Sequence, residues 1–135
     1  MSLDLRSKLI LAVDDSPEDL ALLNAIVMGA GYTFVGAASG EDALSLVHRC
    51  TPRLILLDIQ MPGLGGVETC RRLRENPQLR TVPIAFLTAC KTRGDVKEGL
   101  VAGGNDFIVK PIHRDTLLQR VQHWTNHRIA APKAA

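Results

Sequence analysis

Residues 54–66 read LILLDIQMPGLGG, and this stretch decides the class of fold. Its first four residues are continuously apolar, as in a strand that helices cover on both faces, whereas a half-exposed antiparallel strand would alternate. The run ends at an acid, Asp58, and a turn follows at Pro62 with its neighbouring glycine. Two further glycines, ending at Gly66, precede a segment with helical spacing. The stretch therefore predicts a buried strand, a polar strand end and a turn into a helix.

The same alternation of strand and helix extends outward in both directions. The other short apolar runs are Leu9–Val13, Thr33–Ala37, Val82–Leu87 and Phe107–Val109. Segments with helical signals run from Ser16 to Gly29, from Ser39 to before Pro52, from Gly66 to Asn76, from Gly94 to Ala102, and onward from Arg114. Strands that alternate with helices in this way predict an α/β fold, a parallel sheet with helices on both faces.

The signals at the helix ends differ in strength. The first helix opens with the cap residue Ser16, then Pro17 at the first helical position, then two acids in the positive first turn, Glu18 and Asp19. The fourth helix is weaker, because Gly99 lies in its interior and an interior glycine costs about 1 kcal/mol relative to alanine. We therefore expect the fourth helix to be the most easily remodelled part of the fold.

Size and composition favour one compact globular domain. The chain has 135 residues, of which 46% are hydrophobic and 22% charged. A net charge of +2, without a basic stripe and interleaved aromatics, argues against direct nucleic-acid binding. No apolar stretch approaches the ~20 residues needed to span a bilayer, and no signal-type run follows the N-terminal residues. We therefore expect no membrane partner.

The cysteines and histidines predict no metal or disulfide framework. Cys50, Cys70 and Cys90 form no CxxC pair, which favours free thiols in a reducing cytoplasm. His123 and His127 share one helical face without a third ligand nearby in sequence, so we interpret them as surface side chains rather than zinc ligands.

Reactive side chains gather where the predicted strands end. The residues at these ends are Asp14, Asp15, Asp58, Thr88 and Lys110. In a parallel sheet the carboxyl ends of the strands meet at one edge, so these side chains should share one crevice. Carboxylates that lie so close repel one another unless a divalent cation occupies the site, and hard oxygen ligands suit Mg²⁺. A carboxylate beside Mg²⁺, an ammonium and a hydroxyl is equipped to accept a phosphoryl group.

Each of these residues also has a simpler interpretation. Asp15 is placed to help cap the first helix, and Asp58 to cap the turn that follows its strand. Thr88 is compatible with ordinary polarity at a strand end, and Lys110 with a solvated strand terminus. Their coincidence at one predicted sheet edge is what favours a functional site.

The chain resembles the receiver domains of bacterial two-component response regulators from about Lys8 to His127. The resemblance rests on four motifs in order, Ile10–Ser16, Leu56–Gly66, Leu87–Ala89 and Gly103–Pro111. It implies a flavodoxin-like doubly wound fold, with a five-stranded parallel sheet in the order 2-1-3-4-5 and five helices. The receiver would span residues 8–128, with flexible termini at residues 1–7 and 129–135. Because the chain begins with Met1 and ends in a short tail, a free-standing regulator is favoured over the receiver of a larger protein.

The resemblance also implies a role for each site residue. Asp58 would receive a phosphoryl group from a histidine kinase or a histidine phosphotransfer protein. Asp15 and Asp58 would ligate Mg²⁺ directly, Asp14 mostly through water, and the Gln60 carbonyl would complete the protein ligands. Thr88 and Lys110 would bind phosphoryl oxygens, assisted by the backbone N–H groups of Gln60 and Ala89. Phe107 would turn inward as an aromatic switch when Thr88 moves toward the phosphoryl group, and the Lys110–Pro111 bond would be cis.

The implied activity is signalling rather than catalysis of a metabolic reaction. The domain would catalyse only its own phosphorylation and dephosphorylation, and would switch the surface of its fourth helix, last strand and fifth helix for an unidentified output partner. Gln60 and Cys90 occupy positions that tune dephosphorylation in such proteins. Phe107 lacks the hydroxyl of the tyrosine often found at its position, so a switch must rest on packing alone.

Three other functions compete with this one. A haloacid-dehalogenase-like phosphohydrolase would need a second acid two residues after the nucleophile, where Gln60 stands. A flavodoxin-like small-molecule binder would need a phosphate-cradling loop after the first strand, where the acids Asp14 and Asp15 would repel a flavin phosphate. A degenerate receiver that signals without phosphorylation is disfavoured by the complete set of acids, threonine and lysine.

Overall fold

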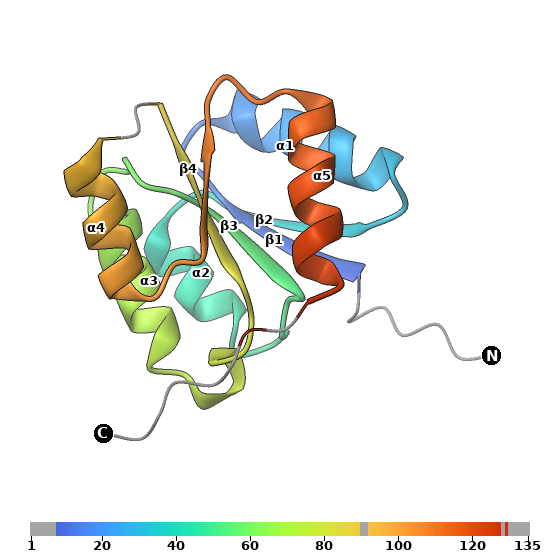
Figure 1. The fold of residues 1–135 in the computed structure, drawn as a ribbon. Coiled ribbons are helices and arrows are strands. Elements are labelled where there is room, and N and C mark those ends of the chain that lie inside the picture. Colours follow the sequence, from blue (N-terminus) through green and yellow to red (C-terminus); the bar gives the residue numbers. More distant parts are fainter. Residues whose placement is uncertain (1–7, 90–91, 128, 130–135) are drawn as a thin grey trace.

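The computed structural model describes residues 8–89, 92–127 and 129, and within them five parallel strands form one sheet in the order β2-β1-β3-β4-β5 (Figure 1). The strands are β1 (Leu9–Val13), β2 (Thr33–Ala37), β3 (Leu54–Asp58), β4 (Ile84–Thr88) and β5 (Asp106–Val109). The helices are α1 (Pro17–Gly29), α2 (Gly40–Leu46), α3 (Gly66–Arg74), α4 (Arg93–Ala102) and α5 (Arg114–Thr125), with a short 3-10 helix η2 (Pro77–Leu79). The predicted flavodoxin-like fold and its strand order are confirmed. The expected flexibility of residues 1–7 and 130–135 and the role expected of Cys90 lie outside the described residues.

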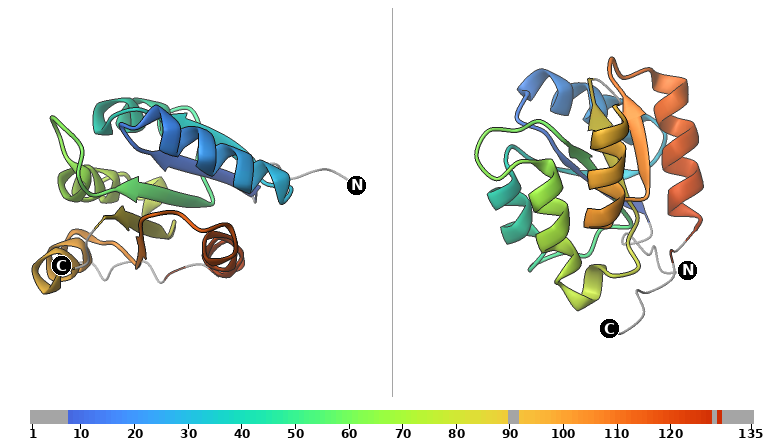
Figure 2. Two further views of the ribbon diagram at one scale, coloured as in Figure 1. Left: turned by 90° about the horizontal axis from the view of Figure 1, so that it is seen from above. Right: turned by 60° about the vertical axis from the view of Figure 1, so that its left-hand side comes forward.

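Helices cover both faces of the sheet, as the continuous apolar runs predicted. Helices α1 and α5 lie on one face and α2, α3 and α4 on the other, and Figure 2 shows α4 and α5 on opposite sides of β5. Every residue of β3 and β4 is buried, whereas β2 is an edge strand with exposed positions. Leu11, Leu57 and Phe86 face the α2–α4 side, and Ile10 and Leu56 face the α1–α5 side. Among the described residues, no helix is both long and apolar enough to cross a bilayer.

Several element ends differ from their predicted positions for local reasons. β3 continues to Asp58, because its parallel pairing with β4 includes Asp58 opposite Leu87. Strand β4 begins at Ile84 rather than Val82. Helix α4 begins at Arg93, one residue earlier than predicted, because the Thr92 hydroxyl caps it by accepting a hydrogen bond from the Asp95 N–H at 3.1 Å. The Lys110–Pro111 peptide bond is cis, as the resemblance implied.

Gly99 in helix α4 has a packing role that the sequence did not reveal. A Cβ atom at this position would lie 2.7 Å from Cζ of Phe107 and 2.9 Å from Cε2 of Phe86. The two phenylalanine rings stack on each other, with centroids 5.4 Å apart. The glycine therefore lets α4 approach the aromatic pair between β4 and β5, in addition to lowering the intrinsic stability of the helix.

Arg74, at the C-terminal end of α3, ties that helix to the end of α4. Its guanidinium donates hydrogen bonds to the Gly103 carbonyl at 2.8 and 3.0 Å, and to the carbonyls of Leu79 and Val82 at 2.7 Å. It also donates to Oδ1 of Asn105 at 2.9 Å. The C-terminal end of α4 is therefore fixed to α3 and to the start of β4.

Candidate functional site

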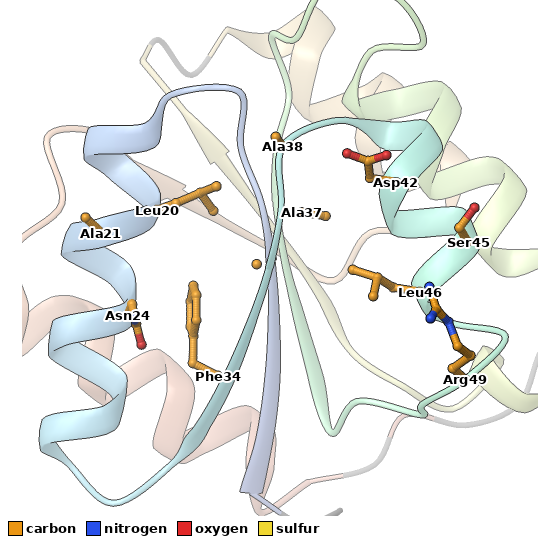
Figure 3. A pocket seen from close by; sticks show the side chains of 11 residues that line it. Leu20, Ala21, Asn24, Phe34, Ala37, Ala38, Asp42, Ser45, Leu46 and Arg49 are labelled. Atoms are coloured by element: carbon orange, nitrogen blue, oxygen red, sulfur yellow. The ribbon is translucent and has the colours of Figure 1, made fainter.

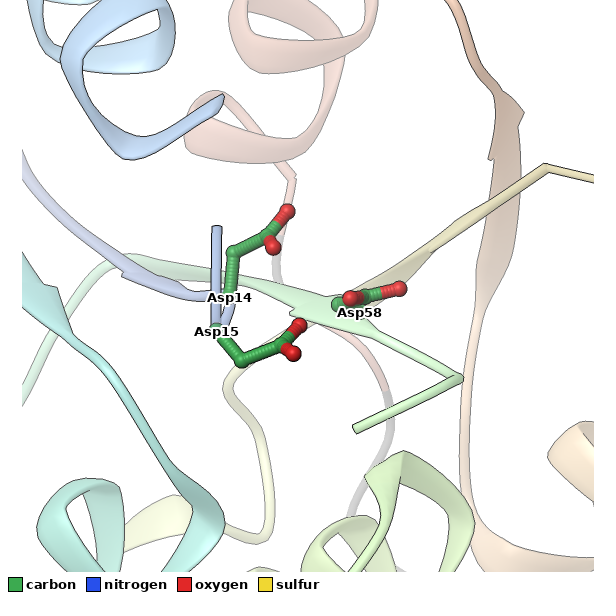
Figure 4. Close-up of side chains that lie close together, drawn as sticks. All are labelled: Asp14, Asp15 and Asp58. Atoms are coloured by element: carbon green, nitrogen blue, oxygen red, sulfur yellow. The ribbon is translucent and has the colours of Figure 1, made fainter. Parts of the chain in front are cut away.

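Three aspartates meet at the carboxyl ends of β1 and β3. The pairing of Val13 with Leu57 in neighbouring parallel strands brings the residues that follow them, Asp14 and Asp58, side by side. Figure 4 shows Asp58 beside Asp14 and Asp15, with the Asp15 carboxylate extending toward Asp58. Each of the three offers an oxygen within 4.8 Å of the others. The predicted cluster of carboxylates is therefore assembled at one sheet edge.

Sheet register also brings Thr88 and Lys110 to this edge. Thr88 ends β4 and pairs with Val109, the last residue of β5, so that Lys110 follows directly. Thr88 is buried with 1% of its surface exposed, and the Lys110 Nζ lies 3.7 Å from Oδ2 of Asp58. Each strand end that the sequence singled out thus lies at the same edge of the sheet.

Asp14 is fully buried and both of its oxygens have protein partners. Oδ1 accepts a hydrogen bond from the Ser16 N–H at 3.0 Å, and Oδ2 accepts one from Nζ of Lys110 at 2.9 Å. Asp15, in contrast, is exposed. An exposed Asp15 that points toward Asp58 is better placed to ligate an incoming cation directly than the engaged Asp14, which fits the roles that the resemblance implied.

Asp58 is shielded from water and lies close to other negatively charged groups. Only 5% of its surface is exposed, and its Oδ1 accepts a hydrogen bond from the Gln60 N–H at 3.3 Å. Burial, and next the negative charge of Asp14, raise the pKa of Asp58 to about 7, while Lys110 and the Gln60 N–H oppose the rise. A cation bound between the carboxylates would reverse this effect and restore the ionised form of Asp58.

Lys110 is shared among carboxylates, one of which the sequence analysis did not assign to the site. Its Nζ donates hydrogen bonds to Oδ2 of Asp14 and to Oδ2 of Asp19, each at 2.9 Å. Burial alone would lower the pKa of Lys110, but its hydrogen bonds to Asp14 and Asp19 outweigh this and raise the pKa. Asp19 lies in the first turn of α1 and had been interpreted only as an acid near a positive helix end. No spacing signal pointed to Asp19, because Asp15 lies before the N-cap Ser16 and the contact is with the distant Lys110.

The loop after β3 brings backbone groups to the same edge. Gly66, the first residue of α3, donates its N–H to the Ile59 carbonyl at 2.9 Å. A Cβ atom on Gly66 would overlap the Asp58 carbonyl oxygen, so only glycine permits this approach of the helix to the strand end. Gln60 and Ala89, expected to contact phosphoryl oxygens through their N–H groups, are both exposed beside the crevice.

Phe107 lies inside the molecule in this structure. Its side chain faces the α2–α4 side of the sheet, and 8% of the residue is exposed. Its ring is stacked on Phe86 beneath α4, and its expected inward turn on phosphorylation of Asp58 stays a prediction. On the outer surface of α4, by contrast, Leu100 and Val101 are 53% and 76% exposed.

The carboxylates fit a divalent cation, whereas a separate cavity is unrelated to them. Clustered carboxylate oxygens are the donors that Mg²⁺ prefers, and burial together with the negative charge of Asp14 raises the pKa of Asp58, as expected of a carboxylate in such a cluster. The cavity, of about 560 Å³, lies between α1, β2 and α2 (Figure 3). The buried Oδ1 atom of Asn24, which has no hydrogen-bond partner, belongs to a residue that lines it. None of the cluster residues lines this cavity.

Comparison with known sequences finds a matching family model and similar curated proteins. The response regulator receiver domain model matches residues 10–122. Response regulator PleD of Caulobacter vibrioides is 38% identical over 120 residues, which cover 89% of this chain and 26% of PleD. The DNA-binding response regulator MtrA of Mycolicibacterium smegmatis is 36% identical over 120 residues, covering 89% of this chain and 51% of MtrA. The chain thus spans about a quarter to a half of the length of these curated relatives.

Solved structures resemble the chain over nearly their whole length. The chemotaxis protein CheY4 of Vibrio cholerae superposes with a TM-score of 0.83 at 31% identity, covering 85% of this chain and 96% of CheY4. The receiver domain of sensor histidine kinase PA1611 from Pseudomonas aeruginosa PAO1 gives a TM-score of 0.83 at 33% identity, covering 89% and 98% of the two chains. That structure holds a magnesium ion coordinated in its active site cleft.

Proposed function

Because the chain belongs to the response regulator receiver domain family, we propose that it accepts a phosphoryl group on Asp58 from a histidine kinase or a histidine phosphotransfer protein. The observation that carries the proposal is the convergence of Asp14, Asp15, Asp58 and Lys110 at one sheet edge. Receiver domains of this kind bind Mg²⁺ at an acidic pocket, and the three aspartates provide such a pocket here. The Gln60 carbonyl would complete the protein ligands.

The proposed reaction uses Asp58 as the nucleophile. A carboxylate oxygen of Asp58 forms a bond to phosphorus while the bond from phosphorus to the donor histidine nitrogen breaks, and that nitrogen keeps the electron pair. Bound Mg²⁺ supplies positive charge next to the transferring oxygens. Lys110 lies 3.7 Å from Asp58 and provides a second positive charge, and the buried Thr88 hydroxyl provides a donor. The chain would act only as a phosphoacceptor that catalyses its own phosphorylation and dephosphorylation.

The output surface that we propose includes the outer side of α4 and the end of β5. Leu100, Val101 and Val109 are large apolar side chains that are 53%, 76% and 48% exposed. They lie on the elements that frame the Phe86–Phe107 pair, so a movement of that pair would be transmitted to them. An apolar partner surface is expected to bind there when Asp58 is phosphorylated.

A small phosphodonor tests the proposed function without knowledge of the kinase. Incubation with acetyl phosphate and Mg²⁺ should add one phosphoryl group to the wild-type protein, as measured by intact mass spectrometry. The same treatment with EDTA, or of Asp58→Asn, should add none. Asp115→Asn is the matched control, since Asp115 is exposed on α5 and forms an ion pair with its exposed neighbour Arg114. A wild-type protein that stays unmodified would refute the proposal.

The phosphohydrolase alternative is not favoured. The position where that chemistry needs a second acid is occupied by Gln60, whose amide side chain has no acidic proton to give to a leaving group. Replacing acetyl phosphate by a phosphate ester separates the two functions, because a phosphohydrolase would consume many equivalents of the ester without remaining modified.

A further inference from the structure

Asp19 forms a contact with the site lysine that neither the motifs nor the metal cluster account for. Its Oδ2 atom lies 2.9 Å from Nζ of Lys110, as close as Oδ2 of Asp14. The side chains of Asp19 and Lys110 are 33% and 18% exposed, so the pair is partly shielded from water. Asp19 comes from helix α1 and is not one of the three clustered aspartates, and its ion pair with Lys110 links it to the site.

The contact determines where the ammonium group lies before phosphorylation. Lys110 has three N–H donors, and Asp14 and Asp19 are both within hydrogen-bond distance of Nζ. Asp58, at 3.7 Å, lies beyond that distance. Lys110 is therefore held by two carboxylates on the α1 side of the crevice, next to Asp58 but not bonded to it.

Resting on the function proposed above, we propose that Asp19 is a positioning residue that retains Lys110 in the unphosphorylated state and opposes its transfer to a phosphoryl group on Asp58. A phosphoryl group brings three new anionic oxygens to Asp58, and Lys110 must redirect its donors to reach them. The hydrogen bond to Asp19 is then weakened or lost. A contact that is stronger in one of two states stabilises that state relative to the other.

Removing the Asp19 charge should therefore favour the phosphorylated form. Asp19→Asn leaves the cap of α1 intact, because the Ser16 hydroxyl accepts from the Asp19 backbone N–H and only the side chain changes. With beryllium fluoride as a phosphoryl mimic and Mg²⁺, the variant should bind the mimic about two- to fivefold more tightly than wild type, the range expected for a partly exposed ion pair. A merely structural role would instead leave the affinity unchanged or lower it.

Two further variants separate this effect from general electrostatics. Glu18→Gln removes an exposed acid from the same helix turn and should leave the affinity for the mimic as in wild type. Asp19→Glu keeps a carboxylate, so its affinity for the mimic should be close to that of wild type rather than raised. In the metal-free protein, a double-mutant cycle of Asp19→Asn with Lys110→Met, measured by urea unfolding, should show a favourable coupling between the two residues.

The possible outcomes distinguish a failure of the proposed function from a failure of the role proposed for Asp19. If wild-type protein does not bind beryllium fluoride, the proposed function fails and the inference fails with it. If wild type binds the mimic but Asp19→Asn binds it equally or more weakly, only the inference is overturned. An equal gain in Glu18→Gln, or a cycle without coupling, would also overturn it, because Asp19 would then act by long-range charge alone.

Discussion

Replacing Asp58 by asparagine should stabilise the metal-free protein, and the gain should grow as the pH rises. The pKa of Asp58 is about 7 in the folded protein and 3.8 at its ordinary value. The folded state therefore binds the proton more tightly than the unfolded state, so ionisation of Asp58 lowers the free energy of unfolding between these two pH values. The full difference corresponds to about 4 kcal/mol, since each pKa unit is worth about 1.4 kcal/mol.

The assay is urea unfolding of both proteins in EDTA, followed by circular dichroism at several pH values. The stability advantage of Asp58→Asn over wild type should increase by roughly 3 kcal/mol between about pH 5 and about pH 8. Asp115→Asn, which removes an exposed acid, should show no comparable trend. An advantage of Asp58→Asn that is constant over this range, or that shrinks as the pH rises, would refute the reasoning about carboxylate burial and repulsion.

Three other predictions follow from the packing and charge of named residues. Gly99→Ala should lower the free energy of unfolding by about 1–3 kcal/mol in urea melts, because its Cβ would overlap the rings of Phe86 and Phe107. Gly94→Ala should not, because its Cβ would make an ordinary contact, at 3.9 Å, with Oγ1 of Thr92. Arg74→Met should lower the free energy of unfolding by about 3 kcal/mol or more, because buried carbonyls lose their hydrogen-bond donors. A decrease no larger than that caused by Arg71→Met, at an exposed position of the same helix, would contradict this. In thermal melts, Mg²⁺ should raise the unfolding temperature of wild type more than that of Asp58→Asn, and equal shifts would argue against the aspartate cluster as the binding site.

Much of the fold could be predicted because the signals are local. Continuous apolar runs such as Leu54–Leu57 indicate buried parallel strands, and the Ser16–Pro17 pair indicates a helix start, without knowledge of distant contacts. The convergence of Asp14 and Asp58 could also be predicted, because it depends only on strand order and on where each strand ends. Residues at the ends of parallel strands are therefore predictable from sequence.

Contacts between elements were harder to predict from the sequence. The role of Asp19 depends on where the first turn of α1 lies relative to Lys110, which sequence spacing does not specify. Gly99 was interpreted as a weakness of the helix, since its approach to Phe107 is visible only when α4 is packed on the sheet. Arg74 gave no signal of its own, because an arginine at the end of a helix ordinarily faces solvent, whereas here it is buried among carbonyl groups.

The most direct test of the central claim is to locate the phosphoryl group itself. After treatment with acetyl phosphate and Mg²⁺, reduction with borohydride converts an aspartyl phosphate to homoserine, and peptide mass spectrometry identifies its position. We predict homoserine at position 58 and at no other aspartate. Modification at Asp14 or Asp15 instead of Asp58, or no reducible phosphoryl group at all, would contradict the account.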